Sequence, residues 1–255
     1  MPALTEILPE ERGRLRPLFD AHPESYIMEA VLEGWGIAWA DHRTAPGTAL
    51  LSYADIVLPG GAWDSEVSRR LLRMIPVNKV ILPAPGWEIL LQKELGTETI
   101  PVTRTRFSSH SLQRNYLKML EQALPGHYRI RRINEALARE IYGHTDLISE
   151  DHIHPLGTPD EFVKRGIGFC VLHGDRIVSG ASSYAVCSRG IEIQVNTHPE
   201  YQGQGLATAV CAALIGHVLD LGLDVKWDAG NEASIQLALR LGFSVTGSYE
   251  ARIRI

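Results

Sequence analysis

The pattern of apolar and polar positions divides the second half of the chain into a series of strands followed by alternating helices and strands. Four segments have strand-like apolar runs, at residues 128–133, 168–172, 177–187 and 190–195. Residues 173–176, between two of these runs, are typical of a hairpin turn. Asn134 caps a helical pattern that runs to residue 141, and a second helix is predicted to begin at residues 158–161.

Helices and strands alternate in the last part of the chain. The predicted elements are a helix at 207–221, a strand at 224–229, a helix between the cap Asn231 and the stop Gly242, and a strand at 244–255. Strands that pair first as a meander and then alternate with helices form a mixed, mainly antiparallel sheet with helices on its faces. We therefore expect an α/β (α+β) fold.

The first half of the chain has a weaker pattern. It predicts helices at 25–32, 87–95 and 111–124 and strands at 36–40, 49–58, 77–83 and 97–107. Leu124-Pro125-Gly126 has the composition of a joint, so we predict an N-terminal α/β domain at residues 1–125 and a second domain at 126–255. No internal sequence repeat identifies the halves as two copies of one fold, although the alternation of elements leaves this open.

The most distinctive motif is Gln202-Gly203-Gln204-Gly205-Leu206-Ala207, which lies between a strand-like run and a predicted helix. Glycines adopt backbone conformations closed to other residues and let a ligand approach the amides. The helix directs its unbonded N–H groups and positive dipole end at an anion bound there. The motif favours a pyrophosphate site, although an ordinary tight turn can have the same glycines. Pro59-Gly60-Gly61 has no supporting motif and is interpreted as a plain strand-to-helix loop.

A second motif is the Asn231-led helix pattern that ends in Leu241-Gly242-Phe243. Together with the glycine turn it resembles the GNAT superfamily of acyl-CoA-dependent N-acetyltransferases, over roughly residues 128–255. The segment 192–197, the run 227–231 and Ser234 resemble one subgroup, the two-part GNAT acetyltransferase family. The resemblance implies a GNAT-type sheet in the second domain and an additional N-terminal α/β domain.

The resemblance also implies that acetyl-CoA is the acyl donor. The strand before the turn would splay from its neighbour and bind the pantetheine arm through Val195, Asn196 and Thr197. The pyrophosphate would be bound by Gln202, Gly203, Gln204, Gly205, Leu206, Ala207 and Thr208.

Glu192 is the candidate general base, because it is a carboxylate on an otherwise apolar strand and partial burial could raise its pKa towards neutrality. Strict alternation puts Glu192, Gln194 and Asn196 on one face. That face could equally be exposed to solvent. The resemblance implies a bulge near Asn196, which would change the facing beyond it.

The proton donor to the leaving thiolate is the main departure from the superfamily. Many members have a tyrosine in the helix before Gly-Phe, whereas this chain has Ala238 there. Asn231 and Ser234 keep polar groups at the start of that helix and are candidate catalytic and cofactor-binding residues. Asn231 could equally be only a helix cap, and Ser234 only a small packing residue.

The segment between the first two helices of the second domain is rich in histidine and acidic residues, namely His144, Asp146, Glu150, Asp151, His152 and His154. A polar loop of this kind is usually solvated, so we expect no metal site and suggest that its carboxylates attract a cationic amine. Trp227 and Asp228 could belong to the core or to the pocket.

Composition excludes several classes of protein. The chain has 255 residues, 45% of them hydrophobic, and a formal net charge of -5, which argues against sequence-independent nucleic-acid binding. No segment has the apolar length of a membrane span, and the acidic N-terminal residues do not form a secretory signal. Together with the three cysteines, expected to be buried thiols, this predicts a cytoplasmic protein without a membrane or nucleic-acid partner.

We therefore expect an acetyl-CoA-dependent N-acetyltransferase that acts on a primary amine of a small molecule. The alternative is a non-catalytic acyl-CoA-binding sensor or regulatory protein, which Ala238 favours and Glu192 disfavours. The N-terminal half could shape the acceptor pocket, form a homodimer contact or bind a second ligand.

Overall fold

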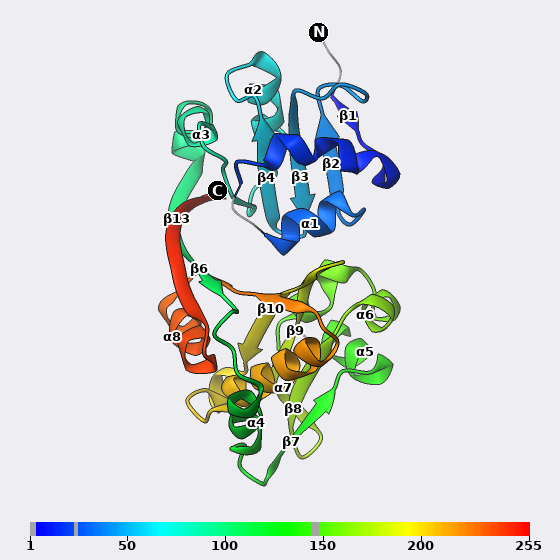
Figure 1. The fold of residues 1–255 in the computed structure, drawn as a ribbon, viewed down its shortest axis with the longest axis vertical. Helices are drawn as coiled ribbons and strands as arrows, with labels where there is room; N and C mark the ends of the chain where they lie inside the picture. Colours follow the sequence, from blue (N-terminus) through cyan, green and yellow to red (C-terminus); the bar gives the residue numbers. More distant parts are fainter. Residues whose placement is uncertain (1–3, 23–24, 144–147) are drawn as a thin grey trace. The chain divides into compact units, whose positions relative to one another are not determined.

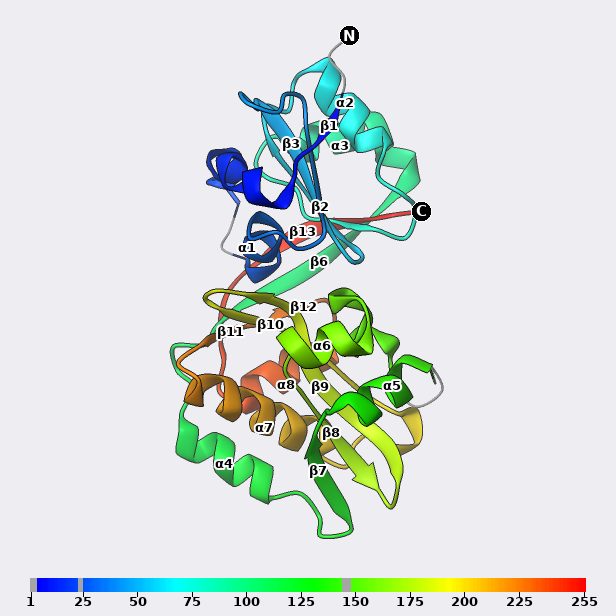
Figure 2. The same ribbon diagram turned by 90° about the vertical axis from the view of Figure 1, so that its right-hand side faces the viewer.

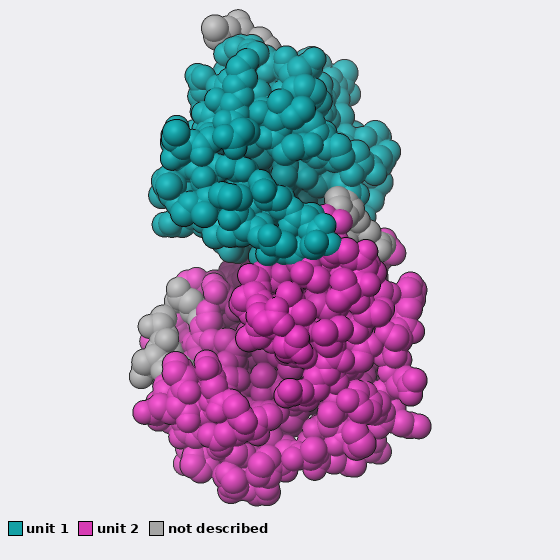
Figure 3. Space-filling model, turned by 90° about the vertical axis from the view of Figure 1, so that its left-hand side faces the viewer, with its two compact units in different colours: residues 1–104, 248–255 teal, residues 105–247 magenta. Residues whose placement is uncertain are grey.

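The computed structural model describes residues 4–22, 25–143 and 148–255 (Figure 1). Figure 3 colours its two compact units: unit 1 comprises residues 1–104 and 248–255, and unit 2 comprises residues 105–247. These units differ from the predicted domains 1–125 and 126–255. Helix α4 (Arg114–Gln122) lies in unit 2, where it packs against helix α7 (Leu206–Asp220). The end of strand β13 (Ser244–Arg254) belongs to unit 1, where it pairs with β5 (Val80–Ile81).

Unit 1 contains a sheet with the strand order β1-β2-β3-β4-β5-β13. Its remaining elements are β1 (Thr5–Glu6), η1 (Pro9–Phe19), α1 (Tyr26–Leu32), β2 (Ile37–Ala40), β3 (Thr48–Tyr53), β4 (Ile56–Gly61), α2 (Glu66–Arg73), α3 (Trp87–Leu95), η2 (Gly96–Glu98) and the start of β6 (Thr99–Ser108). Apolar residues of α2 and α3, among them Leu71 and Trp87, are buried against Leu50 and Val57 of the sheet. Burial of these side chains is the main favourable contribution to the stability of such a layer.

The prediction of a single strand at residues 49–58 is wrong. It is a hairpin of β3 and β4, with Tyr53 paired to Ile56 and Ala54 in the turn at a φ of 46°. Hairpin turns of this kind usually carry glycine or asparagine, and this one has neither at its left-handed position. The strand predicted at 77–83 is shorter and covers only β5, and α2 and η1 are not among the predicted elements.

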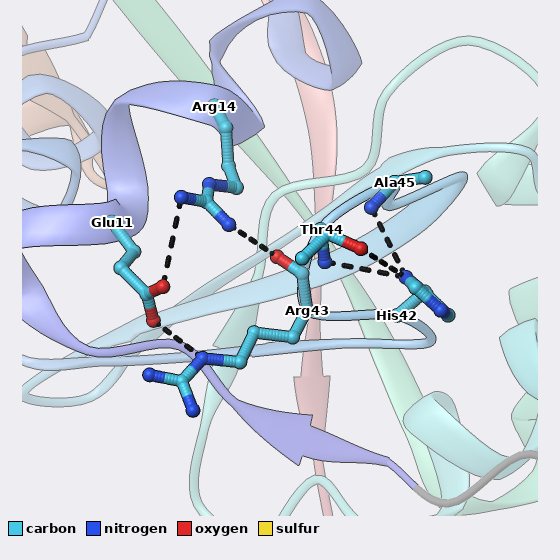
Figure 4. A network of polar contacts seen from close by, with 6 residues as sticks. All are labelled: Glu11, Arg14, His42, Arg43, Thr44 and Ala45. Carbon is cyan, nitrogen blue, oxygen red and sulfur yellow. Dashed lines mark hydrogen bonds and ion pairs between the residues drawn. The ribbon is translucent and has the colours of Figure 1, made fainter.

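A network of polar contacts holds η1 to the loop between β2 and β3 (Figure 4). Arg14 donates to the carbonyl of Arg43 at 2.8 Å, and Arg43 donates to Glu11 at 2.8 Å. His42 Nδ1 accepts from the backbone N–H groups of Thr44 and Ala45. These contacts are exposed, so they fix the loop more than they stabilise the fold.

Unit 2 contains a sheet with the strand order β11-β10-β9-β8-β7. Its remaining elements are β7 (Tyr128–Arg132), α5 (Glu135–Gly143), η3 (Glu150–His152), η4 (His154–Leu156), α6 (Pro159–Arg165), β8 (Gly168–His173), β9 (Arg176–Cys187), β10 (Gly190–Thr197), η5 (Pro199–Tyr201), β11 (Asp224–Lys226), β12 (Asp228–Ala229) and α8 (Glu232–Leu241). Helix α7 packs against β8, β9 and β10, and α5 and α6 lie on the opposite face of the sheet (Figure 2).

Local signals explain where the helices of unit 2 begin and end. Thr158 caps α6 by accepting from the N–H of Glu161, and Asn231 caps α8 by accepting from the N–H of Ser234. Gly242 ends α8 in the left-handed conformation. These boundaries agree with the sequence prediction, and the mixed, mainly antiparallel fold class is confirmed.

The two units repeat one order of elements. In each, the first four strands pair antiparallel in chain order and the fifth is parallel to the fourth, for β1–β5 and for β7–β11. Helical segments follow the first strand, and single helices follow the fourth and fifth strands. The next strand, β6 or β13, then runs through both units. The halves are therefore two versions of one topology, which the sequence analysis had left open.

Among the residues that the structure describes, no helix has the length and apolarity needed to cross a bilayer. All three cysteines, Cys170, Cys187 and Cys211, are buried, and burial raises the pKa of the Cys170 thiol to about 12.

Candidate active site

Strand β10 has two chemically different faces. Ile191, Ile193 and Val195 pack into the core that includes α7. Because side chains alternate along a strand, Glu192, Gln194 and Asn196 lie on the other face. The predicted polar row therefore lies on the face away from α7.

A bulge interrupts the pairing of β10 with β9 directly after Glu192. Glu192 lies opposite Ala185 and Ile193 lies opposite Ser183, so Tyr184 is the additional residue on β9. The bulge expected near Asn196 is thus located four positions earlier in the strand. Asn196 itself is regularly paired, opposite Gly180.

Glu192 is 7% exposed. The interpretation that this side chain faces solvent is therefore wrong. A buried carboxylate next to the point where a sheet changes register fits a chemical role better than a solvating one, and the role as general base stays a prediction.

β10 continues beyond its last pair with β11. The parallel pairing covers Gly190 to Glu192, with Glu192 opposite Lys226. After Trp227 the chain continues as β12, which pairs with β6 at Asp228 and Ala229. Residues 193–197 are therefore paired with β9 on one edge, and β11 does not continue along the other. A strand edge of this kind presents backbone N–H and C=O groups to an extended ligand.

The strand leads into the glycine turn and α7. Gly203 and Gly205 have φ values of 76° and 80°, and a Cβ atom added at either position would meet no atom within 4 Å. Gly205 is the N-cap of α7, with no side chain capping the helix. The first turn of α7, with Leu206, Ala207 and Thr208, therefore has backbone N–H groups that no capping side chain bonds, and such groups suit an anion.

Two side chains of the turn have partners within the protein. Gln202 donates to the carbonyl of Thr197 at 3.2 Å, and Gln204 accepts from the hydroxyl of Tyr128 at 2.6 Å. Both contacts fix the turn, so these two residues would contribute their amides to an anion site. The role of Tyr128 could not be predicted, because its partner is 76 positions away in the sequence.

The glycine pair of unit 1, Gly60 and Gly61, lies at the end of strand β4 and is closely packed. A Cβ atom on Gly60 would lie 2.5 Å from the ring of Phe19, and one on Gly61 would lie 2.3 Å from the carbonyl oxygen of Gly47. These glycines allow close packing. Pro59, Gly60 and Gly61 are the last residues of strand β4 and pair with β3, so the interpretation of this segment as a strand-to-helix loop is wrong.

Helix α8 begins beside β12. The indole of Trp227 donates to Ser234 Oγ at 3.1 Å, and Trp227 is buried beside Phe243. Trp227 therefore belongs to the core. Because Ser234 Oγ accepts this hydrogen bond, its O–H group can still donate. Ala238 is fully buried.

The histidine-rich loop is not simply solvated. His152 is 0% exposed, with Nδ1 at 2.8 Å from Ser182 Oγ and Nε2 at 2.8 Å from Asn196 Oδ1. Burial lowers its pKa to about 4. His154 packs on the ring of Tyr142 at 4.5 Å between centroids.

His144, Asp146 and the side chain of Glu150 lie outside the described residues. Within the described ranges there is no group of three or more His, Cys, Asp or Glu side chains arranged for a metal ion. The expectation of no metal site and the proposed attraction of an amine both stay predictions.

The sequence matches a family model and a known bacterial protein. A family model described as GNAT acetyltransferase matches residues 16–252. The uncharacterized N-acetyltransferase YdfB of Bacillus subtilis (strain 168) is 28% identical over 165 residues, which cover 64% of this chain and 60% of that protein. The match thus spans less than two thirds of the relative's length.

Solved structures extend the likeness to the whole chain. The GCN5-related N-acetyltransferase-like protein from Streptococcus suis 89/1591 has a TM-score of 0.85 at 28% identity, with 96% of this chain and 99% of that chain covered. A tandem GNAT protein from the clavulanic acid biosynthesis pathway shares the fold at 14% identity, with a TM-score of 0.56 over 98% of this chain and 97% of its own. The chain therefore belongs to the GNAT acetyltransferase family, whose model matches most of its length.

Proposed function

We propose that this protein transfers the acetyl group of acetyl-CoA to the primary amine of a small molecule by direct attack on the thioester. Acetyl transfer is the activity that the family name describes. The observation that carries the proposal is the edge of β10 at residues 193–197 leading into the open turn at Gly203 and Gly205. A thioester with an extended arm and a pyrophosphate fits this pair of features.

The backbone would hold the donor. Val195, Asn196 and Thr197 would bind the pantetheine arm along the strand edge, and the amides from Gly203 to Thr208 would bind the pyrophosphate. The left-handed glycines suit this site, since any larger residue would place a Cβ atom in the open space at the turn.

Glu192 is the proposed base. It lies on the face of β10 that also carries Gln194 and Asn196, away from α7. An amine that approaches on this face forms a bond to the acetyl carbon while the bond from carbon to sulfur breaks. The ammonium proton passes to the Glu192 carboxylate, directly or through one water molecule.

Ser234 is the proposed donor to the leaving thiolate. Its hydroxyl accepts from Trp227 and keeps its own proton for donation, whereas Asn231 uses its side-chain oxygen as the cap of α8. Ala238 supports the second candidate, a non-catalytic acyl-CoA sensor, because the tyrosine common in the superfamily is replaced by a buried methyl group.

The acceptor and the assembly are further proposals. We propose a small amine that binds near the loop between α5 and α6, with no nucleic acid or membrane as partner. A homodimer is compatible with this proposal.

The test is the exchange of Glu192 for glutamine, which keeps the shape and removes the base. We expect kcat to fall about hundredfold, as for loss of a general base, with the Kd of CoA unchanged. Glu161→Gln on α6 is the control, since that carboxylate only forms ion pairs with Lys164 and Arg165 of its own helix. Full turnover by Glu192→Gln from pH 6 to 9 would refute the assignment of the base.

A further inference from the structure

His152 connects the loop between α5 and α6 to two strands of the sheet. The ring is fully buried, and each nitrogen has a partner on a different strand: Ser182 on β9 and Asn196 on β10, both at 2.8 Å. A buried polar group with both of its nitrogens satisfied is held in one orientation.

Strand β9 has a glycine, and so no side chain, where it passes the ring of His152. Gly180 lies opposite Asn196 in the ladder, and a Cβ atom on Gly180 would come within 2.9 Å of His152 Nε2 and 2.6 Å of Ile148 Cδ1. Any side chain at position 180 would therefore push the loop away from β9 and β10. The absence of a side chain at Gly180 therefore permits the close approach of the ring.

The protonation state of the ring suits this bridge. Burial lowers the pKa of His152 to about 4, so the ring is neutral near pH 7. A neutral imidazole has one N–H and one lone pair. Asn196 Oδ1 can only accept, so Nε2 has the proton and donates to β10, and Nδ1 accepts from the Ser182 hydroxyl on β9.

The bridge lies where β10 has lost the support of β11. That pairing ends at Glu192, whereas Asn196 lies four residues further along. Ser179 of β9 adds to the support, because its hydroxyl lies 3.2 Å from the carbonyl oxygen of Asn196 and 2.7 Å from Thr197 Oγ1. Polar contacts from β9 and from η3 therefore fix the end of β10.

We propose that His152 is a positioning residue for the donor: through Asn196 it holds the end of β10 in the geometry that binds the pantetheine arm. The inference rests on the proposed function. A rigid strand edge binds an extended ligand more tightly, because less freedom is lost on binding. The same contact ties the acceptor-side loop to the donor strand.

Two substitutions at His152 separate this role from simple packing. The amide of His152→Gln reaches the position of Nε2 and can keep the contact with Asn196. The shorter His152→Asn reaches the position of Nδ1 and can keep only the contact with Ser182. Each variant loses one buried hydrogen bond, so we expect similar losses of melting temperature.

The proposal predicts different effects on the donor. His152→Asn should raise the KM for acetyl-CoA and the Kd of CoA about tenfold, with a smaller effect on the KM for the amine, and His152→Gln should stay within about twofold of the wild type. Adding Asn196→Ala to His152→Asn should cause no further loss. Equal donor KM values in the two variants, whatever their stability, would overturn the proposal.

A measurement on the unmodified protein covers variants that fail to fold. In ¹⁵N NMR spectra of the histidine rings, saturating CoA should shift the Nε2 resonance of His152, because its partner Asn196 borders the bound arm. An unchanged resonance would refute the proposed role of His152 but not the proposed function of the protein. If the wild-type protein binds no CoA by calorimetry, the proposed function itself fails, and this inference with it.

Discussion

At the scale of the residue, the site depends on polar side chains that are buried by neighbours distant in the sequence. Glu192 is buried where β9 has one residue more than β10. His152 is buried because Gly180 has no side chain. Burial of such groups lowers stability unless they are hydrogen-bonded, so their presence together on one face of β10 points to function.

The buried histidine predicts a dependence of stability on pH. The folded pKa of His152, about 4, lies below the ordinary value of 6.5. As the pH falls below about 6.5, the unfolded chain gains this proton before the folded protein does, so stability is lost on acidification between pH 6.5 and 4. The shift corresponds to roughly 3 kcal/mol in the free energy of unfolding.

Urea unfolding at pH 7, 6, 5 and 4 measures this loss. The His152→Gln variant has no titrating group at this position and serves as the reference, since all other groups contribute equally to both proteins. The wild type should lose the additional stability on acidification. If the free energy of unfolding falls equally with pH in the wild type and in His152→Gln, His152 is not buried as a neutral ring.

Individual residues could be predicted where the partner is local. Asn231 was expected as a helix cap, and it accepts from the N–H of Ser234, three residues away. The contacts of His152 with Ser182 and Asn196 join positions 30 and 44 residues apart, and no periodic pattern encodes them. The sequence therefore indicated a solvated loop where the structure has a buried ring.

At the scale of the element, the junction of β10 and α7 determines whether an anion can bind. We predict that Gly205→Ala lowers the affinity for CoA at least tenfold, because the new methyl group enters the open space at the turn where we propose that the pyrophosphate binds. The substitution also strains the backbone, by about 1 kcal/mol at a positive φ.

Gly222→Ala is a matched control for this strain. Gly222 has a φ of 75° and the same open surroundings, and it lies just beyond the other end of α7. Calorimetric titration with CoA should show normal affinity for this variant. Equal CoA affinities of Gly205→Ala and Gly222→Ala would mean that the phosphates of CoA do not bind at the glycine turn.

Elements were predictable where caps and turns carry ordinary signals. Thr158 and Asn231 are the N-caps of α6 and α8, as the sequence pattern predicts. The hairpin of β3 and β4 was missed because Ala54 adopts a conformation that usually selects glycine or asparagine. The continuous apolar pattern at 49–58 therefore concealed a turn.

At the scale of the whole molecule, the chain contains one topology twice, and the glycines near the end of the fourth strand of each unit have different surroundings. Unit 2 has open glycines at 203 and 205, whereas Gly60 and Gly61 of unit 1 pack against Phe19 and Gly47. The repeat could not be recognised from the sequence, because a topology is conserved by the pairing of strands and not by residue identity. We therefore expect one donor site in each chain.

The proposed transferase is tested by titration of the full chain with acetyl-CoA, followed in the same sample by a free-thiol assay over a panel of primary amines. We expect one acetyl-CoA bound per chain and release of CoA thiol that depends on the amine. Binding without release by any amine would contradict the transferase and favour the sensor. No binding at all would contradict the donor site itself.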